Sequence, residues 1–427
     1  MAEIKKILIL GQSVAGAAFI ERLRAVDTES SVTVISSGNS LAAKRELFAA
    51  FLAKEIKEDQ VLFKAKNFYE QNKVQLVFGK KVIRVDFKRK RVVTEEKEQF
   101  DFDILIIADL GIRFPEIKGV NKAGVFSLRN LDAVKDVVDL LPLVESVAIE
   151  DDSIWAVQTA LAFAKRGKEV IFVVSSNDIL ASMVEEEASR VLAQQLEKNN
   201  VRIIKENKIQ EILGEGEVKA VRLKTGKVLA CQIAIIGNTK TDLRLFAESV
   251  LQIQNGILTN GEFQTNLENV FAADTVCESE ASALPLEEQG RMIAQKISDQ
   301  EISAKPLLRT EVFDLLGCPV AFIGTTRSSA DTQKFTVHNE AMGSFAQIFS
   351  SQNILVGAVL INTALSQEKI VRLIQEKIDI SGSEEQIFND QNSYEHIVSL
   401  SQEKRACAQP EQETFAATQT DQKPESL

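Results

Sequence analysis

The sequence of 427 residues lacks the basic excess that nucleic-acid binding requires: 61 Asp and Glu stand against 50 Lys and Arg, and the formal net charge is -11. Binding to a phosphate backbone depends on clustered Lys and Arg, so we expect no nucleic acid as a main partner. No apolar run approaches the roughly 18–20 residues that span a bilayer, so we expect no membrane span. The first residues, MAEIKKILILGQS, read as a strand and not as a cleavable leader. We therefore predict a cytoplasmic protein.

Histidine and cysteine are also scarce. The two histidines, His338 and His396, are too few for a multi-histidine metal site. The four cysteines lie far apart in the sequence, at Cys231, Cys277, Cys318 and Cys407. This spacing excludes a zinc knuckle, an iron–sulfur motif and a redox dithiol motif. We predict free thiols and no metal site.

The apolar pattern is that of parallel β–α–β units. An apolar run at 4–10 is followed by Gly11, an amphipathic stretch at 14–26 and a second apolar run at 32–35. The same order returns later, with strand, helix and strand at 146–149, 154–166 and 169–174. This order predicts parallel sheets, and its repetition predicts two dinucleotide-binding-type folds.

The last third of the chain has a different pattern. Four short predicted strands precede a predicted helix at 367–377, and they lie at 320–324, 334–338, 344–350 and 354–361. These elements indicate a small α+β domain. Beyond 381 the chain is rich in polar residues, and we predict a short helix near 384–404 and disorder from about Ala406.

Six segments carry a resemblance to a known family: GQSVAG (11–16), KRELFAAFLAKE (44–55, expected as one helix), GVFSLRNLDA (124–133), RGKEV (166–170), NGILTNGEFQTNLENVFAAD (255–274) and EEQGRMIAQ (287–295). The chain resembles the pyridine-nucleotide-dependent flavoprotein reductases, in the branch of the rubredoxin reductases and the flavin module of assimilatory nitrite reductase. The resemblance implies an α/β fold with two doubly wound domains, one inserted in the other. It assigns an FAD-type domain to 1–113 and 240–305, an NAD(P)-type domain to 114–239, an α+β interface domain to 306–380, and a polar tail to 381–427.

The first phosphate turn is altered at one of its three small residues. Such a turn needs a first residue for the tight bend, a second for close approach of the pyrophosphate, and a third for packing of helix on strand. Gly11 and Gly16 keep the first and third places, and Ser13 takes the second, where it crowds the phosphate but can donate a hydrogen bond. The ribose-binding acid is expected at Gly38, which has no side chain. Arg45 matches a family arginine near the flavin phosphates and is a candidate anion contact, with a plain surface role as the alternative.

Two further segments that meet the flavin in the family are also altered. The family's Ala-Thr-Gly is Ala108-Asp109-Leu110 here, and its Ala-Ala-Gly-Asp is Ala272-Ala273-Asp274-Thr275. One unpaired like charge at about 4 Å costs roughly 4 kcal/mol, or about three decades of affinity. Alternatively, Asp274 points outward or replaces the missing aspartate. The candidate FAD contacts are therefore Gly11, Ser13, Gly16, Arg45, Asp274 and Thr275, in a site where FAD binding is weakened or lost.

The second phosphate turn is altered at every glycine position. Glu150, Asp152 and Trp155 occupy the three places, so carboxylates stand where backbone N–H groups and a helix dipole should meet a pyrophosphate. The same acids suit the helix N-terminus itself. Ser175 stands where the residue that selects NAD or NADP is expected, and Val157 replaces the glutamate common beside the nicotinamide. We predict that NAD(P)H does not bind here.

Two functional hypotheses follow. In the first, the chain is a degenerate homologue without catalytic residues, a non-catalytic or scaffold subunit of a redox complex. In the second, it is an FAD-binding oxidoreductase that passes electrons between protein partners. A divergent NAD(P)H-dependent reductase is the third reading. The number of altered positions favours the first. Both leading hypotheses imply protein partners, and they leave a homo-oligomer open.

Overall fold

The computed structural model describes residues 4–301, 308–389 and 394–408. The chain divides into two compact units, 1–307 and 308–427, and each is considered by itself. The first unit holds two five-stranded parallel sheets. The α/β class predicted from the sequence is therefore confirmed. The domain boundaries stay a prediction, since both sheets belong to one compact unit.

The first parallel sheet has the strand order β19-β7-β1-β2-β3. Its strands are β1 (Lys6–Leu10), β2 (Ser31–Ile35), β3 (Val74–Val77), β7 (Ile104–Ile107) and β19 (Val270–Ala272). The run from Ile7 to Leu10 is at most 2% exposed, as expected of a parallel strand covered on both faces. Burial of this apolar run is what fixes β1 at the centre of the sheet.

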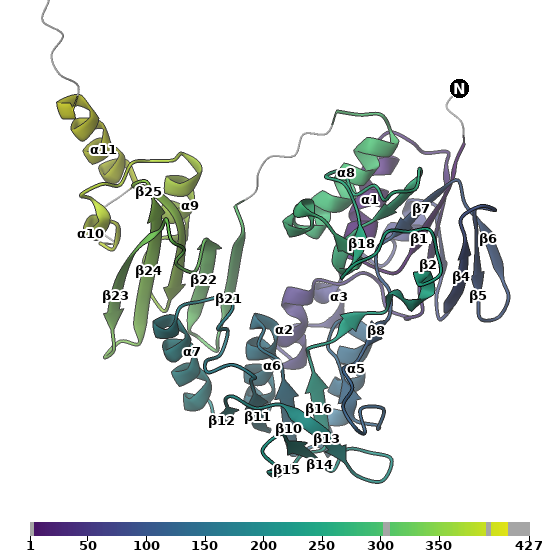
Figure 1. The fold of residues 1–427 in the computed structure, drawn as a ribbon, viewed down its shortest axis with the longest axis horizontal. Coiled ribbons are helices and arrows are strands. Elements are labelled where there is room, and N and C mark those ends of the chain that lie inside the picture. The colour runs from purple at the N-terminus through teal and green to yellow at the C-terminus, as the bar shows by residue number, and fades with distance from the viewer. Residues whose placement is uncertain (1–3, 302–307, 390–393, 409–427) are drawn as a thin grey trace, which may run out of the picture. The chain divides into compact units, whose positions relative to one another are not determined.

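Helices cover one side of this sheet and an antiparallel sheet covers the other (Figure 1). The helices are α1 (Val14–Arg24) and α8 (Leu286–Ile297), which pack together at Gly290. A Cβ on Gly290 would lie 2.0 Å from the Ala15 carbonyl oxygen, so only glycine allows this approach. The antiparallel strands are β4 (Val82–Asp86), β5 (Arg91–Thr94) and β6 (Gln99–Asp101). The basic residues at 88–90 form the turn between β4 and β5.

The second parallel sheet has the order β12-β11-β10-β16-β9. Its strands are β9 (Val125–Phe126), β10 (Ser146–Glu150), β11 (Glu169–Val173), β12 (Val201–Ile204) and β16 (Ile233–Ile236). Its helices are α5 (Leu131–Leu140), α6 (Ile154–Lys165) and α7 (Glu186–Lys198). A small antiparallel sheet completes it, with β13 (Ile209–Leu213), β14 (Ala220–Leu223) and β15 (Val228–Ala230). The chain passes between the two sheets at β8 (Ile112–Arg113) and β17 (Lys240–Thr241), which pair with each other.

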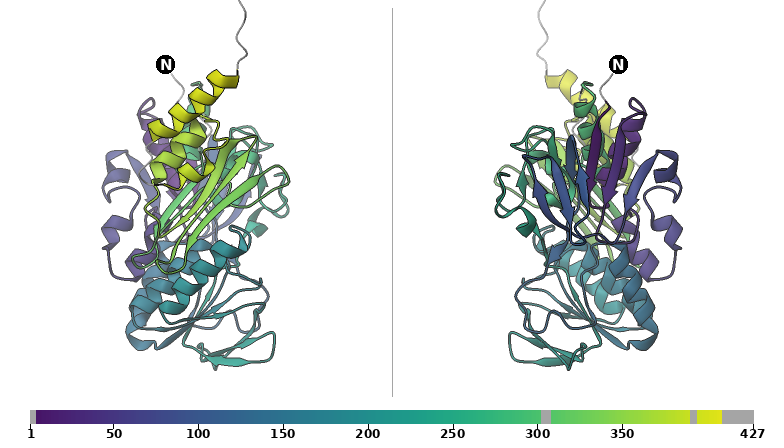
Figure 2. Two further views of the ribbon diagram at one scale, coloured as in Figure 1. Left: turned by 90° about the vertical axis from the view of Figure 1, so that its left-hand side faces the viewer. Right: turned by 90° about the vertical axis from the view of Figure 1, so that its right-hand side faces the viewer.

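The second unit is an antiparallel sheet of order β21-β22-β25-β24-β23 with helices against one face (Figure 2). Its strands are β21 (Thr310–Asp314), β22 (Pro319–Gly324), β23 (Gln333–Asn339), β24 (Ser344–Ser351) and β25 (Ile354–Ile361). Its helices are α9 (Gln367–Gln375), α10 (Glu384–Ile387) and α11 (Tyr394–Ala408). The predicted disorder from Ala406 lies mostly outside the described residues. No helix within the described ranges has both the length and the apolar character needed to cross a membrane.

The single helix predicted at 44–55 is wrong. The segment forms a 3-10 turn, Arg45–Leu47, and a short helix α2, Phe48–Leu52. Lys54 takes a left-handed φ of 60°, and the N–H groups of Lys54 and Glu55 donate to the carbonyls of Phe51 and Ala50. This is the Schellman arrangement that ends a helix, and glycine usually provides it. A lysine in that position gave no signal in the sequence.

Candidate functional site

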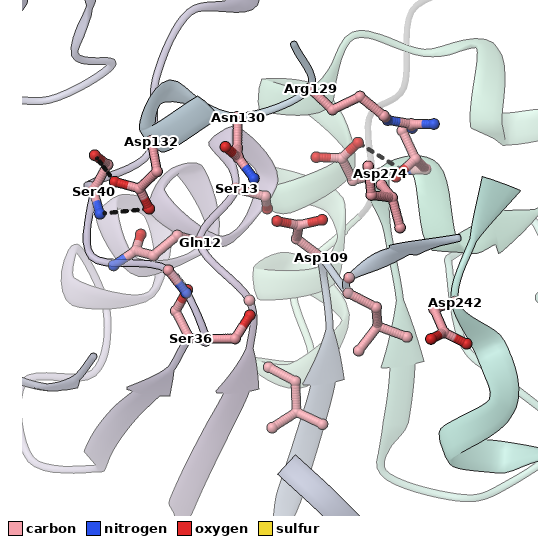
Figure 3. Close-up of a pocket in the computed structure, with 18 of the residues that line it drawn as sticks. Gln12, Ser13, Ser36, Ser40, Asp109, Arg129, Asn130, Asp132, Asp242 and Asp274 are labelled. Carbon is pink, nitrogen blue, oxygen red and sulfur yellow. Dashed lines mark hydrogen bonds between the residues drawn. The ribbon is translucent and has the colours of Figure 1, made fainter. Parts of the chain in front are cut away.

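A cavity of about 650 Å³ opens at the carboxyl ends of the first parallel sheet (Figure 3). Ligands of open α/β sheets bind at this edge, and this volume suits a cofactor. Of the predicted site residues, those that line the cavity are Gly11, Ser13, Arg45, Asp274 and Thr275. Gly16 does not line it. Further charged residues line it that sequence reasoning did not select, namely Lys80, Lys81, Arg129, Asp132, Asp242 and Arg244.

The first turn keeps the backbone of a dinucleotide turn. Gly11 has a φ of 93°, and a Cβ there would lie 2.1 Å from the Asp109 carbonyl oxygen, so β1 and β7 require glycine at this point. A Cβ on Gly16 would lie 3.4 Å from Ile9 Cγ2, which places Gly16 at the contact between helix and strand. The Ser13 hydroxyl accepts a hydrogen bond from the Gly16 N–H at 3.0 Å and so caps α1. Serine in the second place thus stabilises the helix end.

Within the described part of the chain, two buried donors of residues that line the cavity have no hydrogen-bond partner: Gln12 Nε2 and Arg45 Nε. The Gln12 amide is held by its oxygen, which accepts from the Tyr69 hydroxyl at 3.0 Å. A buried donor left unpaired costs about 1–3 kcal/mol, so both groups favour an acceptor inside the cavity. Burial lowers the pKa of Arg45 to about 10, with repulsion by Arg129 adding to the effect, and the guanidinium therefore stays charged at neutral pH.

In the segment 272–275, Asp274 stands where the family has glycine. It keeps the left-handed backbone conformation typical of glycine but adds a carboxyl group. Asp274 has a left-handed φ of 63°, its N–H donates to Gln289 Oε1 at 2.8 Å, and its Oδ1 accepts from the Thr275 N–H at 2.6 Å. Burial raises the pKa of Asp274 to about 6, against the opposing effects of the Thr275 hydrogen bond and the charge of Arg129. Burial, with the Asp274 charge, raises the pKa of Asp109 to about 7. Neither carboxyl is therefore fully ionised throughout the neutral range.

A third carboxylate, Asp132, lies at the other end of the cavity (Figure 3). It comes from the first turn of α5 and accepts hydrogen bonds from the Asn39 N–H at 2.8 Å, the Ser40 N–H at 3.3 Å and the Ser40 hydroxyl. A Cβ on Gly38 would lie 2.6 Å from Asp132 Oδ2. Sequence reasoning missed this residue, although it stands in the segment 124–133 that carried the family resemblance.

At the second turn, Glu150 and Asp152, which occupy two of the three glycine positions, accept hydrogen bonds from other residues of the protein. Glu150 Oε2 accepts from the Ile209 N–H at 2.5 Å. Asp152 accepts from the Ser176 hydroxyl and from the Leu180 N–H, both at 2.6 Å. Burial raises the pKa of Glu150 and of Asp152. These carboxylates fill the turn with internal hydrogen bonds.

Asp151, the intervening acid, and Trp155 also make contacts within the protein. Asp151 Oδ2 lies 2.1 Å from where a Cβ on Gly237 would be, and it accepts from the Ser153 hydroxyl at 2.6 Å. The Arg45 guanidinium lies 5.3 Å from the centre of the Trp155 ring, within cation–π range. The side chain at the third glycine position of the second turn thus contacts a residue of the first cavity.

A family model for the pyridine nucleotide-disulphide oxidoreductases matches residues 5–295. The chain belongs to this family. The resemblance read from the sequence is therefore confirmed. Cys231 and Cys277 are free thiols, and both are buried, as is Cys318. Burial raises the pKa of the Cys277 thiol to about 12, so it is a poor nucleophile at neutral pH.

Sequence relatives include a nitrite reductase, an electron transfer subunit and a rubredoxin reductase. The nitrite reductase [NAD(P)H] of Bacillus subtilis is 24% identical over 388 residues, which are 88% of this chain and 48% of the relative. The assimilatory nitrate reductase electron transfer subunit of the same organism is 20% identical over 94% of this chain and 53% of the relative. The rubredoxin-NAD(+) reductase of Pseudomonas putida is 24% identical over 62% of this chain and 70% of the relative. The chain spans about half the length of the first two relatives.

Solved structures show the same fold. The covalent putidaredoxin reductase–putidaredoxin complex matches with a TM-score of 0.81, at 15% identity, over 93% of this chain and 99% of the solved chain. The NADH:rubredoxin oxidoreductase of Clostridium acetobutylicum matches with a TM-score of 0.72, at 18% identity, over 93% of this chain and all of the solved chain (100%). At these identities the likeness extends to the fold alone.

Proposed function

We propose that this chain is an FAD-binding electron-transfer subunit that acts with a protein partner and does not take electrons from NAD(P)H at its own second turn. The observation that carries the proposal is the contrast between the two turns. At the first, buried donors of Gln12 and Arg45, two residues that line the cavity, have no hydrogen-bond partner among the described residues. At the second, the carboxylates of Glu150 and Asp152 are bonded to the protein.

The residues of the first cavity fit the parts of FAD. Gly11 and Ser13 stand at the dinucleotide turn, Arg45 and Gln12 supply donors for phosphate oxygens, and Thr275 lies at the end that meets the ribityl chain in the family. Charge-assisted bonds from Arg to phosphate are among the strongest that a protein makes. When bound, FAD supplies the ability to accept and release electrons. The residues of this chain bind and orient it, and they exclude water from the diphosphate.

The names of the relatives support a protein partner. One is an electron transfer subunit of an assimilatory nitrate reductase, and one solved relative was captured in complex with putidaredoxin. Other relatives carry NAD(P)H or NAD(+) in their names, so the loss of that cofactor is proposed for this chain alone. The proposed loss of NAD(P)H binding is supported by the hydrogen bonds that the carboxylates of the second turn accept within the protein, and by the contact of Trp155 with Arg45.

A scaffold subunit without flavin is the second candidate. The observation that favours it is the pair of half-buried carboxyl groups, Asp109 and Asp274, in the wall of the cavity. Repulsion between these groups and a diphosphate lowers the affinity whenever they are ionised. The cytoplasmic location stays a prediction.

One preparation of the full-length chain tests these proposals. We expect FAD to bind at pH 6 with one flavin per chain, measured by absorbance after denaturation and by equilibrium dialysis. Absence of saturable FAD uptake at pH 6 would leave the scaffold candidate. Trp155 is the chain's only tryptophan, so its emission reports on the second turn. NADH titrated to 1 mM should change this emission only by inner-filter attenuation, and a saturable response, or bleaching of bound flavin by NADH, would overturn the loss of NAD(P)H binding.

A further inference from the structure

We propose that Asp132 binds the ribose of the ligand in the first cavity and replaces the acidic side chain that is missing at Gly38. The ligand class is then a ribonucleoside diphosphate, such as the ADP half of FAD. The inference rests on the proposed function and adds the residue that recognises the sugar.

The space at Gly38 is the first argument. This residue follows β2, where a dinucleotide fold normally places the acid that binds the ribose hydroxyls. A Cβ there would lie 2.6 Å from Asp132 Oδ2, so the Asp132 carboxylate occupies the position of the absent side chain. An acidic residue at 38 and Asp132 in its present position exclude each other. The two positions, which are far apart in the sequence, therefore form one site.

The hydrogen bonds of Asp132 are the second argument. Its carboxylate accepts from two backbone N–H groups, of Asn39 and Ser40, and from the Ser40 hydroxyl. A carboxylate has about four acceptor positions, so about one stays available to a ligand hydroxyl. The hydroxyl of Ser36, which accepts from the Gly38 N–H at 3.1 Å, also lines the cavity here. This end of the cavity thus offers one anionic acceptor and two hydroxyls, which suit a vicinal diol, and Lys80 and Lys81 also line the cavity next to them.

The position of Asp132 in α5 is the third argument. Asn130 caps the helix by accepting from the Ala133 N–H at 2.9 Å, and Asp132 stands in the first turn, where the helix dipole favours a negative charge. The carboxylate is therefore fixed before a ligand arrives. A role limited to fastening the loop at 38–40 is the alternative that an experiment must separate.

The test compares ADP with 2′,3′-dideoxy-ADP on the full-length, flavin-free chain by isothermal titration calorimetry. We expect the wild type to bind ADP about tenfold more tightly, which corresponds to about 1.4 kcal/mol. Asp132→Ala should remove this preference, and Gly38→Asp in the Asp132→Ala background should restore it, because the clash at position 38 is then gone. Gly38→Asp alone should weaken binding. Asp139→Ala, which removes an exposed carboxylate from the same helix, should change nothing.

The outcomes separate the possible failures. If Asp132 only fastens the loop, Asp132→Ala weakens both nucleotides equally, and the proposal is overturned. If the wild type binds both nucleotides equally, the ribose assignment falls while the nucleotide site stands. If the wild type binds neither nucleotide, both the proposed function and the assignment of Asp132 to the ribose are refuted. If Asp132→Ala does not fold, Asp132→Asn, which keeps one acceptor for the loop, is measured in its place, and its retention of the full preference would also overturn the proposal.

Discussion

Raising the pH from 5 to 8 should weaken FAD binding to this chain by about three decades. The groups responsible are Asp109 and Asp274, which line the cavity, and Asp109 lies beside Gly11, the first residue of the phosphate turn. Both have a raised pKa in the ligand-free protein, and a bound diphosphate favours their neutral forms further. Binding therefore takes up protons, and the affinity falls as the pH rises.

The magnitude follows from the two pKa values, about 7 for Asp109 and about 6 for Asp274. Each pH unit above a pKa adds about 1.36 kcal/mol to the cost of keeping that group neutral. At pH 8 this cost is about 1.4 kcal/mol for Asp109 and about 2.7 kcal/mol for Asp274, and at pH 5 it nearly vanishes for both. At pH 7 it is about 2 kcal/mol in total, so the roughly 4 kcal/mol estimated for one full charge overstates the penalty at neutral pH.

The assay is equilibrium dialysis of FAD against the full-length chain between pH 5 and 8. The logarithm of Kd should be flat below pH 6, rise by up to one decade per pH unit between 6 and 7, and approach two decades per unit above 7. Asp274→Asn should limit the slope to one, because asparagine keeps the left-handed backbone without the charge. The control is Asp242→Asn: Asp242 lines the same cavity, but the hydrogen bond from Arg244 lowers its pKa, so this variant should keep the wild-type slope.

A Kd that stays constant from pH 6 to 8 in the wild type would refute this reasoning. So would a steep slope that persists after both Asp109 and Asp274 are replaced by asparagine. In either case the two carboxyls would not face the diphosphate.

Three further predictions concern single residues. Asp274→Asn should raise the unfolding temperature by a few degrees more at pH 8 than at pH 5. The pKa of Asp274 in the folded protein is about 6, above the usual 3.8, so its ionisation lowers the free energy of unfolding by about 1.4 kcal/mol more at pH 8 than at pH 5. Equal shifts in calorimetric scans at the two pH values would contradict this. Arg45→Gln should weaken FAD binding about 10- to 100-fold in the same dialysis assay through loss of a charge-assisted bond, and an unchanged Kd would remove Arg45 from the site. Gly11→Ala should lower the free energy of unfolding by about 2–4 kcal/mol in urea, because its Cβ would lie 2.1 Å from the Asp109 carbonyl oxygen, and a loss under about 1 kcal/mol would show that the two strands can separate.

Much of the fold could be predicted because its signals are local. The strand predicted at 354–361 is β25 to the residue, and the helix predicted at 154–166 is α6 to within one residue. Strand β21 was missed because its burial alternates over only five residues and two of them are Thr310 and Asp314. The helix at 44–55 was predicted too long because a lysine, and not a glycine, takes the left-handed position after α2.

The site was predictable only where its residues share one turn. The spacing of Gly11, Ser13 and Gly16 gave the first turn, and the acids that replace the glycines gave the second. Asp132 contacts Asn39 and Ser40 in the loop after β2, which precede it by 93 and 92 positions in the sequence. No sequence pattern connects residues so far apart. The unpartnered Gln12 Nε2 could not be predicted either, because glutamine in a turn is usually a solvated residue. Contacts between elements, and not the turns themselves, decide these roles.

The glycines on both sides of α1 have a consequence for how the cavity can respond to its contents. Gly16 sets the helix against the sheet, and Gly290 brings α8 within backbone contact of Ala15. Because α1 is closely packed on both sides, its amino end cannot move away from the cavity to fit a larger ligand or toward it to contact a smaller one. Adaptation must come from rotation or protonation of side chains, so the empty and occupied forms should superpose closely along this helix. Substitutions of cavity side chains that aim to strengthen diphosphate binding should therefore leave the backbone of α1 in place.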